Sequence, residues 1–198
     1  MSSPSLDELI SSLKCLPGVG QKSAQRMALH LLEREQEGAR RISAAISNAI
    51  DTVKHCQRCR NFSDQEVCEI CSNPGRDQGT VCVVETPADV LAVESSAAYR
   101  GRYFVLLGRL SPLDGYGPGQ LGLDELENQL SAGDTQEVIL ATSATVEGDI
   151  TAQYIADFAA GLGIRSSRLA RGIPIGGELE FVDSSTLSKA LSGRQKID

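Results

Sequence analysis

Four cysteines are the residues of this 198-residue chain whose type and spacing most clearly point to chemistry. Cys56 and Cys59 form one CxxC pair, Cys68 and Cys71 form a second, and eight residues separate the two pairs. Because a CxxC turn directs two sulfurs to one side, the two pairs can supply the four thiolates of one tetrahedral Zn²⁺ site. Such a site leaves no open coordination position, so the spacing predicts a structural zinc rather than a catalytic one.

Redox dithiols or disulfides are the alternative interpretation of these four cysteines. The other two cysteines, Cys15 and Cys82, each stand alone in an apolar segment. The N-terminal residues lead straight into an amphipathic pattern without a signal peptide, so we expect a reducing, cytoplasmic location, which disfavours disulfides. No apolar run approaches the roughly 18 residues of a membrane span, so we expect no contact with a membrane. The simplest role for such a zinc motif is to fold a short linker without binding any further ligand.

Three acidic residues form a second candidate site in the C-terminal part of the chain. Glu85 directly follows one predicted strand, and Glu147 and Asp149, spaced E-x-D, follow another after a short loop. Because the carboxyl ends of parallel strands meet at one edge of a sheet, the three carboxylates could together hold a hard cation such as Mg²⁺ through oxygen ligands. The plainer alternative is that Asp149 caps the next helix and that Glu85 is solvated.

Two glycines and two basic residues form a third candidate site near the N-terminus. Gly18 and Gly20 stand in a turn between two helical patterns, and Lys22, Arg26 and His30 follow at helical spacing on the second helix. Glycine lets the backbone come close to a phosphate, and the first amides of a helix point toward it. The pattern predicts contacts with DNA phosphates that are independent of sequence and sensitive to salt. The alternative is an ordinary helical hairpin with a solvated basic face.

Three predicted helices position this basic hairpin. They span Leu6–Leu13, Gln21–Arg34 and Ala39–Val53, and Ser5 with Glu8 reads as a capping box at the start of the first. The apolar residues expected to face inward are Ala24, Met27, Ala28 and Leu31 on the second helix and Ile42, Ile46, Ala49 and Val53 on the third.

Strands and helices alternate after Gly79, which predicts a parallel α/β unit. The predicted strands are Thr80–Val84, Tyr103–Leu107, Val138–Ala141 and Arg165–Ala170. The predicted helices are Pro87–Glu94, which Thr86 caps, Leu123–Leu130 and Ile150–Ala160.

The charge of the chain is unevenly distributed. The net charge is −7, yet residues 1–55 carry seven Lys/Arg against six Asp/Glu, whereas residues 80–198 carry nine against sixteen. The acidity belongs to the C-terminal part, so we expect any contact with nucleic acid in the N-terminal part or in a local patch.

The order of these motifs resembles the RecR family of bacterial recombination mediators. The resemblance covers nearly the whole chain and is most specific in the stretches Leu16–Arg26, Leu110–Gly115 and Gly172–Leu179 and in the four cysteines. It implies an α/β fold class in several parts, each with its own boundaries. These are a helix-hairpin-helix region at residues 1–55, a four-cysteine zinc finger at 56–72, a Toprim domain at 80–172 and a C-terminal oligomerisation segment at 173–198 with a helix near Ser185–Leu191.

The resemblance also implies a function. RecR-like proteins are non-enzymatic mediators of recombinational DNA repair that act with RecO and RecF at gaps or single-strand/double-strand junctions. They help to load RecA there and form homodimers or ring-shaped homotetramers around DNA. The resemblance places the DNA contacts on Lys22 and Arg26 and the Toprim acids at Glu85, Glu147 and Asp149, and it implies a cytoplasmic protein associated with the nucleoid.

A metal-dependent Toprim nuclease or primase-like enzyme is the alternative function. Strand passage also needs a tyrosine nucleophile, usually in a separate domain, but all four tyrosines lie inside the α/β part, and there is no GxxxxGK[ST] stretch for nucleotide hydrolysis. The chain departs from many RecR-like sequences at Ser143-Ala144, which replaces Asn-Pro, and at Arg109 and Arg171, which replace histidines. Because histidine is largely neutral at pH 7, the arginines make this region more permanently cationic.

Two interpretations connect these parts. The acidic exterior of the Toprim domain is expected to dock a basic partner such as RecO, with complementary charge steering the encounter. The zinc motif is expected to act as a joint between the DNA-facing hairpin and this partner-facing domain, where the metal replaces a hydrophobic core that a short linker cannot build.

Overall fold

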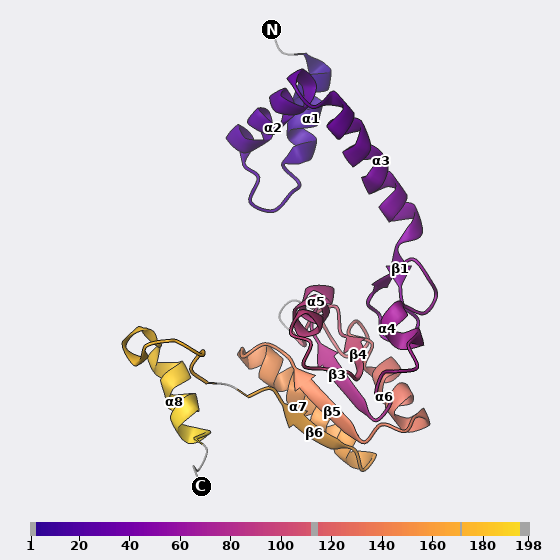
Figure 1. Cartoon of the computed structure of the whole chain (residues 1–198), viewed down its shortest axis with the longest axis vertical. Coiled ribbons are helices and arrows are strands. Elements are labelled where there is room, and N and C mark those ends of the chain that lie inside the picture. The colour runs from indigo at the N-terminus through magenta and orange to yellow at the C-terminus, as the bar shows by residue number, and fades with distance from the viewer. Residues whose placement is uncertain (1–2, 112–114, 171, 195–198) are drawn as a thin grey trace. The chain divides into compact units, whose positions relative to one another are not determined.

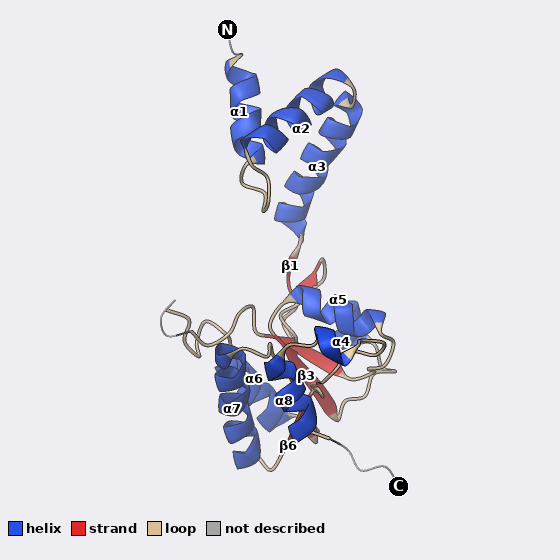
Figure 2. Ribbon diagram, turned by 90° about the vertical axis from the view of Figure 1, so that its left-hand side faces the viewer, coloured by secondary structure: helices blue, strands red, loops and turns tan. Residues whose placement is uncertain are grey.

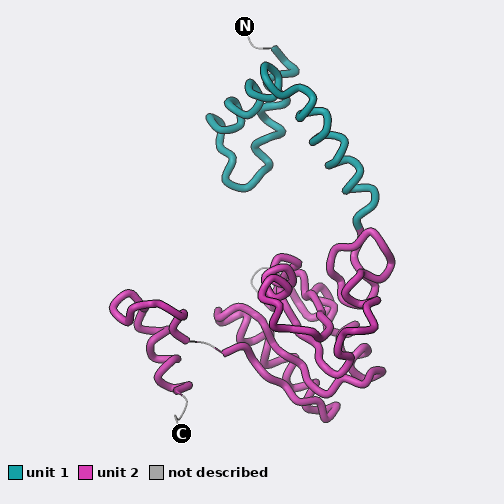
Figure 3. The backbone as a smooth tube through the Cα atoms, viewed as in Figure 1, with its two compact units in different colours: residues 1–53 teal, residues 54–198 magenta. Residues whose placement is uncertain are grey.

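The computed structural model describes residues 3–111, 115–170 and 172–194 (Figure 1). The chain divides into two compact units, residues 1–53 and residues 54–198 (Figure 3). The predictions that concern residues 112–114 and Arg171 fall outside the described residues. None of the helices described here is both long enough and apolar enough to cross a membrane.

The first unit consists of three helices, α1 (Pro4–Leu13), α2 (Gln21–Glu33) and α3 (Gln36–Thr52). Its buried centre is small, because two of its members are alanines that let α1 and α2 approach closely. The buried residues are Ile10, Ala24 and Ala28, and Leu6, Leu9, Leu13 and Val19 pack around them. The predicted second helix is therefore confirmed, with its alanines turned toward α1, but the prediction that Met27 faces inward is wrong, because its side chain is exposed.

The capping box predicted at Ser5 is wrong. The helix begins at Pro4, and Ser3 is its N-cap residue without a side-chain cap hydrogen bond. Proline has a fixed φ suited to the first helical position and has no amide to satisfy there, so it starts the helix before Ser5 can.

The prediction that α3 turns its apolar residues inward is also wrong for the single chain. The helix starts three residues earlier than predicted, and none of its residues is buried. Ile42 and Ile46 are 53% and 56% exposed, and Ile50 is 75% exposed. The sequence pattern identified an apolar face correctly, but α1 and α2 do not cover it, so the face remains open to solvent in the isolated chain.

The second unit is built on a four-stranded parallel sheet in the order β4-β3-β5-β6. Its strands are β3 (Thr80–Val84), β4 (Arg102–Val105), β5 (Glu137–Ala141) and β6 (Arg165–Arg168). Its main helices are α5 (Pro87–Ser95), α6 (Leu123–Ala132) and α7 (Val146–Gly161). The predicted parallel α/β unit is confirmed.

Successive side chains along each strand point to opposite faces of the sheet, and this divides the core into two layers, one on each face. Val81 and Val83 belong to one cluster, together with residues of α6 and α7, whereas Cys82 and Val84 belong to the other, on the side of α5 (Figure 2). This follows from the two-residue period of a strand, and burial on both faces explains why β3 is apolar at nearly every position.

Several element ends differ from those predicted, each for a local reason. β4 ends at Val105, because Leu107 adopts a left-handed conformation with φ +60° that leaves the strand. β6 ends at Arg168. α7 starts at Val146, four residues earlier than predicted, because the Thr145 side chain accepts a hydrogen bond from the Gly148 N–H and caps the helix there. The predicted cap at Thr86 is confirmed, where Thr86 and Asp89 form a reciprocal capping box.

The cysteine-rich segment folds as a small finger at the start of the second unit. β1 (Lys54–His55) pairs antiparallel with β2 (Phe62–Ser63), and α4 (Glu69–Ser72) follows. The four cysteines share one buried cluster with core residues of the α/β sheet, namely Cys82, Val84, Val90, Tyr103 and Val105. The finger is therefore part of the core of the second unit and not a separate body.

Arg60 fastens the finger to the sheet. Its guanidinium donates hydrogen bonds to the backbone carbonyls of Leu121 and Gln120 and lies 5.7 Å from the centre of the Phe104 ring. The Val105 N–H also donates to the Cys59 carbonyl at 2.8 Å, so the finger covers the end of β4.

An ion pair secures the segment that follows the finger. Arg76 and Glu94 form a two-pronged pair, and the Tyr103 hydroxyl donates to the same carboxylate at 2.6 Å. The Arg76 guanidinium holds the pKa of Glu94 below its usual range, while burial raises the pKa of Tyr103. The segment between α4 and β3 is thus tied to α5 and β4 by charge as well as by packing.

The C-terminal segment contains a short 3-10 helix, η2 (Leu179–Phe181), and the helix α8 (Ser184–Ser192), which confirms the predicted helix near residues 185–191. The Asp183 side chain caps α8 by accepting hydrogen bonds from the Ser185 and Thr186 N–H groups. Large apolar side chains of this segment are exposed, namely Ile173, Ile175, Leu179, Phe181 and Leu191.

Candidate metal and nucleic-acid sites

The finger brings four buried cysteine sulfurs together. Cys56 and Cys59 come from the turn between β1 and β2, Cys68 immediately precedes α4 and Cys71 lies within it. The four Sγ atoms lie within 4.8 Å of one another, and the Cys59–Cys68 pair is 3.5 Å apart. A disulfide requires about 2.05 Å, whereas a tetrahedron of Zn–S bonds of about 2.3 Å separates its sulfurs by roughly 3.8 Å. The arrangement therefore fits a zinc ion and not a pair of disulfides.

Backbone amides prepare Cys56 to act as a thiolate. Burial alone would raise the pKa of this thiol, but N–H groups of Cys68, Cys59 and Arg58 offset it and lower the pKa to about 7. The amides of Cys68 and Arg58 lie 3.3 and 3.4 Å from the Cys56 sulfur. Because a metal binds the thiolate form, these donors favour Cys56 as the first ligand near neutral pH, whereas a hydrogen bond with Cys71 raises the pKa of Cys59 and burial raises the pKa of Cys68.

The turn between α1 and α2 exposes its backbone. Gly18 has φ +77°, and Gly20 is the N-cap of α2 with φ −85°. A Cβ atom added to either glycine would meet no atom within 4 Å. The first turn of α2 has no acidic residue and no capping side chain among the described residues, so its amides are open to an anion.

Basic side chains run along α2 from this start to the other end of the helix. Lys22, Arg26 and His30 share one face of α2, as their spacing predicted, and line a shallow groove of about 460 Å³. The remaining lining residues are Gln25, Leu29, Glu33 and Arg34. Arg34 was missed by sequence reasoning, although its position twelve residues after Lys22 continues the same helical series.

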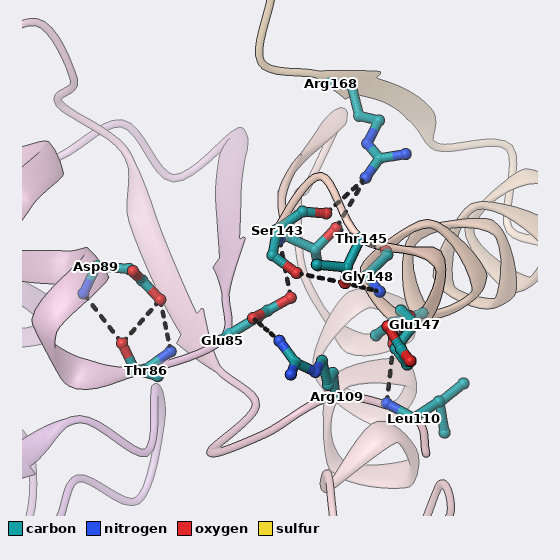
Figure 4. A network of polar contacts seen from close by, with 12 residues as sticks. Glu85, Thr86, Asp89, Arg109, Leu110, Ser143, Thr145, Glu147, Gly148 and Arg168 are labelled. Atoms are coloured by element: carbon teal, nitrogen blue, oxygen red, sulfur yellow. Dashed lines mark hydrogen bonds and ion pairs between the residues drawn. The ribbon is translucent and has the colours of Figure 1, made fainter. Parts of the chain in front are cut away.

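The acids at the edge of the sheet have other partners than the shared cation that the sequence predicted. Glu85 is buried at the carboxyl end of β3, and its Oε1 atom accepts a hydrogen bond from the Ser143 N–H at 2.8 Å (Figure 4). Its Oε2 atom lies 3.8 Å from the Arg109 Nη1 atom. A backbone amide and an arginine therefore already compensate this buried carboxylate.

Asp149 is paired with a second arginine. Its Oδ1 atom lies 2.8 Å from the Nη1 atom of Arg168, which ends β6. The Nη2 atom of Arg168 donates to the Thr142 hydroxyl at 3.1 Å and to the Ser143 carbonyl at 3.4 Å. Sequence reasoning missed Arg168; its place near the carboxyl end of a predicted strand, the end where the acids were expected, was the available signal.

Among the described residues, the three acids are not gathered into one ligand group, and the magnesium site stays a prediction. Within residues 3–111, 115–170 and 172–194, only the four cysteines form a group of three or more ligand atoms that all lie within 4.8 Å of one another. Two arginines lie against Glu85 and Asp149, and no ion pair of Glu147 is found among the described residues. The alternative that Asp149 caps α7 is wrong, because Thr145 occupies that role.

Comparison with known proteins gives consistent matches along the chain. Four family models match consecutive stretches, which are RecR helix-hairpin-helix at residues 6–50, the RecR zinc finger domain with four cysteines at 53–73, Toprim domain at 79–170 and RecR C-terminal at 172–195.

Relatives match over the full length. The chain is 58% identical over 192 residues to the Recombination protein RecR of Xanthomonas campestris pv. campestris (strain 8004), covering 97% of this chain and 98% of that protein. It is 56% identical over 197 residues to the Recombination protein RecR of Saccharophagus degradans (strain 2-40 / ATCC 43961 / DSM 17024), covering 100% of both. The chain belongs to the RecR family. The RecR resemblance of the sequence is thereby confirmed, and so is its combination of a helix-hairpin-helix, a four-cysteine zinc finger and a Toprim domain.

The RecR assignment gives each site its place in the protein. The four cysteines are the ligands of a structural zinc in the zinc finger, as both their geometry and the family model indicate. The basic groove lies in the RecR helix-hairpin-helix region, and the arginine-paired acids lie in the Toprim domain.

Proposed function

We propose that this RecR-family chain is a non-enzymatic, DNA-binding mediator of recombinational repair. The observation that carries the proposal is the start of α2, where open glycine backbone, uncapped amides and an acid-free first turn lie beside Lys22 and Arg26. These groups would hold DNA by its phosphates, so binding would not depend on sequence.

A metal-dependent nuclease or primase-like enzyme is the alternative, and two features favour the mediator. Toprim catalysis depends on a metal held by carboxylates, whereas Glu85 and Asp149 here face arginines. Of the tyrosines, Tyr103 is buried with its hydroxyl donated to Glu94, and the Tyr99 hydroxyl donates to the backbone of Arg102. These two hydroxyls are therefore occupied, whereas Tyr116 and Tyr154 are exposed, so the arginines beside the acids carry most of the argument against an enzyme.

The proposed assembly is a homodimer or a homotetrameric ring that surrounds DNA. Apolar faces support this, because α3 exposes Ile42, Ile46 and Ile50, and the C-terminal segment exposes Ile175 and Phe181. Apolar groups gathered on a surface are typical of interfaces between proteins. We propose residues 1–55, 56–72, 80–172 and 173–198 as the helix-hairpin-helix, zinc-finger, Toprim and oligomerisation parts of this assembly in the cytoplasm, in association with the nucleoid.

The proposed mechanism assigns separate surfaces to DNA and to partners. The hairpin would bind phosphates at a gap or single-strand/double-strand junction, while RecO, a basic partner, would dock on the acidic Toprim exterior, and RecF would act with them to help load RecA. Complementary charge would steer RecO to the Toprim domain and keep DNA away from it.

The purified, zinc-loaded chain is expected to bind gapped DNA and to bind it more tightly when RecO is present. A mobility-shift titration at low salt with and without RecO measures both affinities, and light scattering measures the mass against the 21.1 kDa of one chain. We expect a mass of two or four chains and intact DNA after incubation with Mg²⁺. Cleavage of the DNA would support the nuclease instead, and no binding under either condition would contradict the mediator.

Partner docking is expected to depend on Glu147 more than on Glu85. Glu85 is occupied within the protein, whereas the Glu147 carboxylate has no ion pair among the described residues. Reversing its charge with Glu147→Lys should weaken RecO binding by about tenfold, a cost of ~1.4 kcal/mol, mostly through slower association. Biolayer interferometry measures both rates. Glu127→Lys, which reverses an exposed acid on α6, is the matched control; an equal loss there would show that only net charge matters.

A further inference from the structure

We propose that the acidic edge of this Toprim domain is a metal-independent site, in which the guanidinium groups of Arg109 and Arg168 replace a divalent cation. The proposal rests on the Toprim assignment, on the Arg168–Asp149 ion pair and on the contacts of Arg109 with Glu85 and of Arg168 with Ser143 that Figure 4 shows. It is independent of the proposed DNA contacts on α2. Its failure would remove one argument against the nuclease alternative but would leave the proposed DNA contacts on α2 untouched.

Both carboxylate oxygens of Glu85 already face a donor or a positive charge. Its side chain is 12% exposed, one oxygen accepts the Ser143 N–H, and the other faces Arg109. A buried carboxylate must be compensated by hydrogen bonds or an opposite charge, and both are already present. Mg²⁺ requires oxygen ligands near 2.1 Å in octahedral geometry, and the positive charge of Arg109 beside Glu85 would oppose its approach.

Three contacts within the protein orient the Arg168 side chain. It contacts the Asp149 carboxylate, the Thr142 hydroxyl and the Ser143 carbonyl, which come from the first turn of α7 and the loop after β5. The ion pair uses the Nη1 atom and the two hydrogen bonds use the Nη2 atom, so both ends of the guanidinium are oriented by the protein. A cation at Asp149 would have to break these contacts together.

The charge balance of the edge also disfavours a divalent cation. Three carboxylates alone would present three negative charges, which attract Mg²⁺ strongly. The two guanidinium groups beside Glu85 and Asp149 reduce this to one net negative charge, carried by Glu147. Because the affinity of a cation site depends on the number of charged ligands and on their freedom to converge, the remaining site is weak.

The arginines also perform the bridging that a metal would otherwise provide. Arg109 follows β4 and reaches the end of β3, and its neighbour Leu110 is anchored by an N–H donated to the Thr151 hydroxyl on α7 at 2.9 Å. Arg168 joins the end of β6 to the start of α7. The loops at this edge are therefore connected by ion pairs within the protein, so the geometry of the edge does not require a metal.

Manganese binding tests the proposal. Mn²⁺ replaces Mg²⁺ in oxygen sites, and its free concentration is read directly by electron paramagnetic resonance on the full, zinc-loaded chain. The unaltered protein is expected to bind no Mn²⁺ at about 1 mM, the weak end of the range for protein cation sites. The double variant Arg109→Ala/Arg168→Ala is expected to gain a Mn²⁺ site with a Kd of about 0.1 mM or tighter, and adding Glu85→Gln to it should remove that site.

Controls separate this outcome from unfolding and from general charge. Arg165→Ala removes an exposed arginine of β6 that pairs with Glu137 at the other end of β5, and it should gain no site. Zinc content and thermal unfolding show whether each variant is folded. If the double variant does not fold, the milder variant Arg109→Gln is tested in its place. The proposal is overturned if the unaltered protein binds Mn²⁺ with a Kd of about 1 mM or tighter at a site that Glu85→Gln abolishes. It is equally overturned if the folded arginine variants gain no binding, because the arginines would then not be what excludes the metal.

Discussion

Cys71→Ser is expected to release zinc and to lower the free energy of unfolding of the 54–198 unit by at least about 3 kcal/mol. The serine removes one of four thiolates whose geometry fits a single ion. The cost extends beyond the finger, because the cysteines share a buried cluster with Tyr103 and Val105 of β4. Losing the metal would expose this side of the sheet, and a loss of that size is a large share of the roughly 5–15 kcal/mol that stabilises a domain.

Zinc content and urea unfolding measure the two parts of this prediction. Cys15→Ser is the matched control, because Cys15 is exposed and lies outside the metal site, so it should change neither quantity. A Cys71→Ser protein that keeps one zinc per chain and its full stability would contradict the structural role. If it lost DNA binding alone, with stability and oligomer intact, the finger would instead be a contact for the nucleic acid.

The zinc site could be predicted from the sequence, but its packing could not. All four ligands fall within sixteen residues, so local spacing alone was sufficient to identify them. The joint interpretation expected the metal to serve a linker, whereas the finger is built into the Toprim side of the molecule. The contacts that decide this, such as the hydrogen bond from Arg60 to Leu121, connect residues 61 positions apart, and no local pattern records them.

At the acidic edge, too, the sequence predicted which residues lie there but not what they contact. The parallel topology predicted that Glu85 and the E-x-D acids follow strands that end at one edge, and the structure places them there. Their pairing depends on how β6 registers against β5. Leu140 lies opposite Arg168 in that register, which brings the guanidinium to the loop after β5. Register between distant strands is a property of the assembled sheet, so the sequence could indicate the acids but not their partners.

The face of α3 gives a third case. Its isoleucines recur at helical spacing, which indicates correctly that this face is apolar. The spacing of apolar residues shows only that a helix is amphipathic and does not identify what covers its apolar face. The prediction assumed that the neighbouring helices would do so. The exposed isoleucines instead leave room for another chain, which is why they support the proposed oligomer.

Lys22→Ala/Arg26→Ala is expected to weaken DNA binding roughly 10- to 100-fold at low salt and to reduce the slope of log affinity against log salt by about 2. Each phosphate contact releases condensed counterions from DNA, so removing two contacts lowers the salt dependence in proportion. Neither residue belongs to the buried centre of the first unit, so the fold should remain. Fluorescence anisotropy with labelled single-stranded and gapped DNA at several salt concentrations measures both the affinity and the slope.

Two further variants identify what the DNA contacts. Arg40→Ala/Arg41→Ala removes the same charge from exposed positions of α3 and should leave the slope nearly unchanged. Gly20→Ala tests the backbone, because its φ of −85° suits alanine and the new Cβ would meet no atom of the protein. Substituting Gly18 would be a poorer test, because its φ of +77° would strain any other residue and could weaken binding for that reason alone. A folded Gly20→Ala protein with weakened binding would place a phosphate against the hairpin amides, whereas an equal loss of slope in the α3 variant would mean that DNA responds only to the overall charge of the unit.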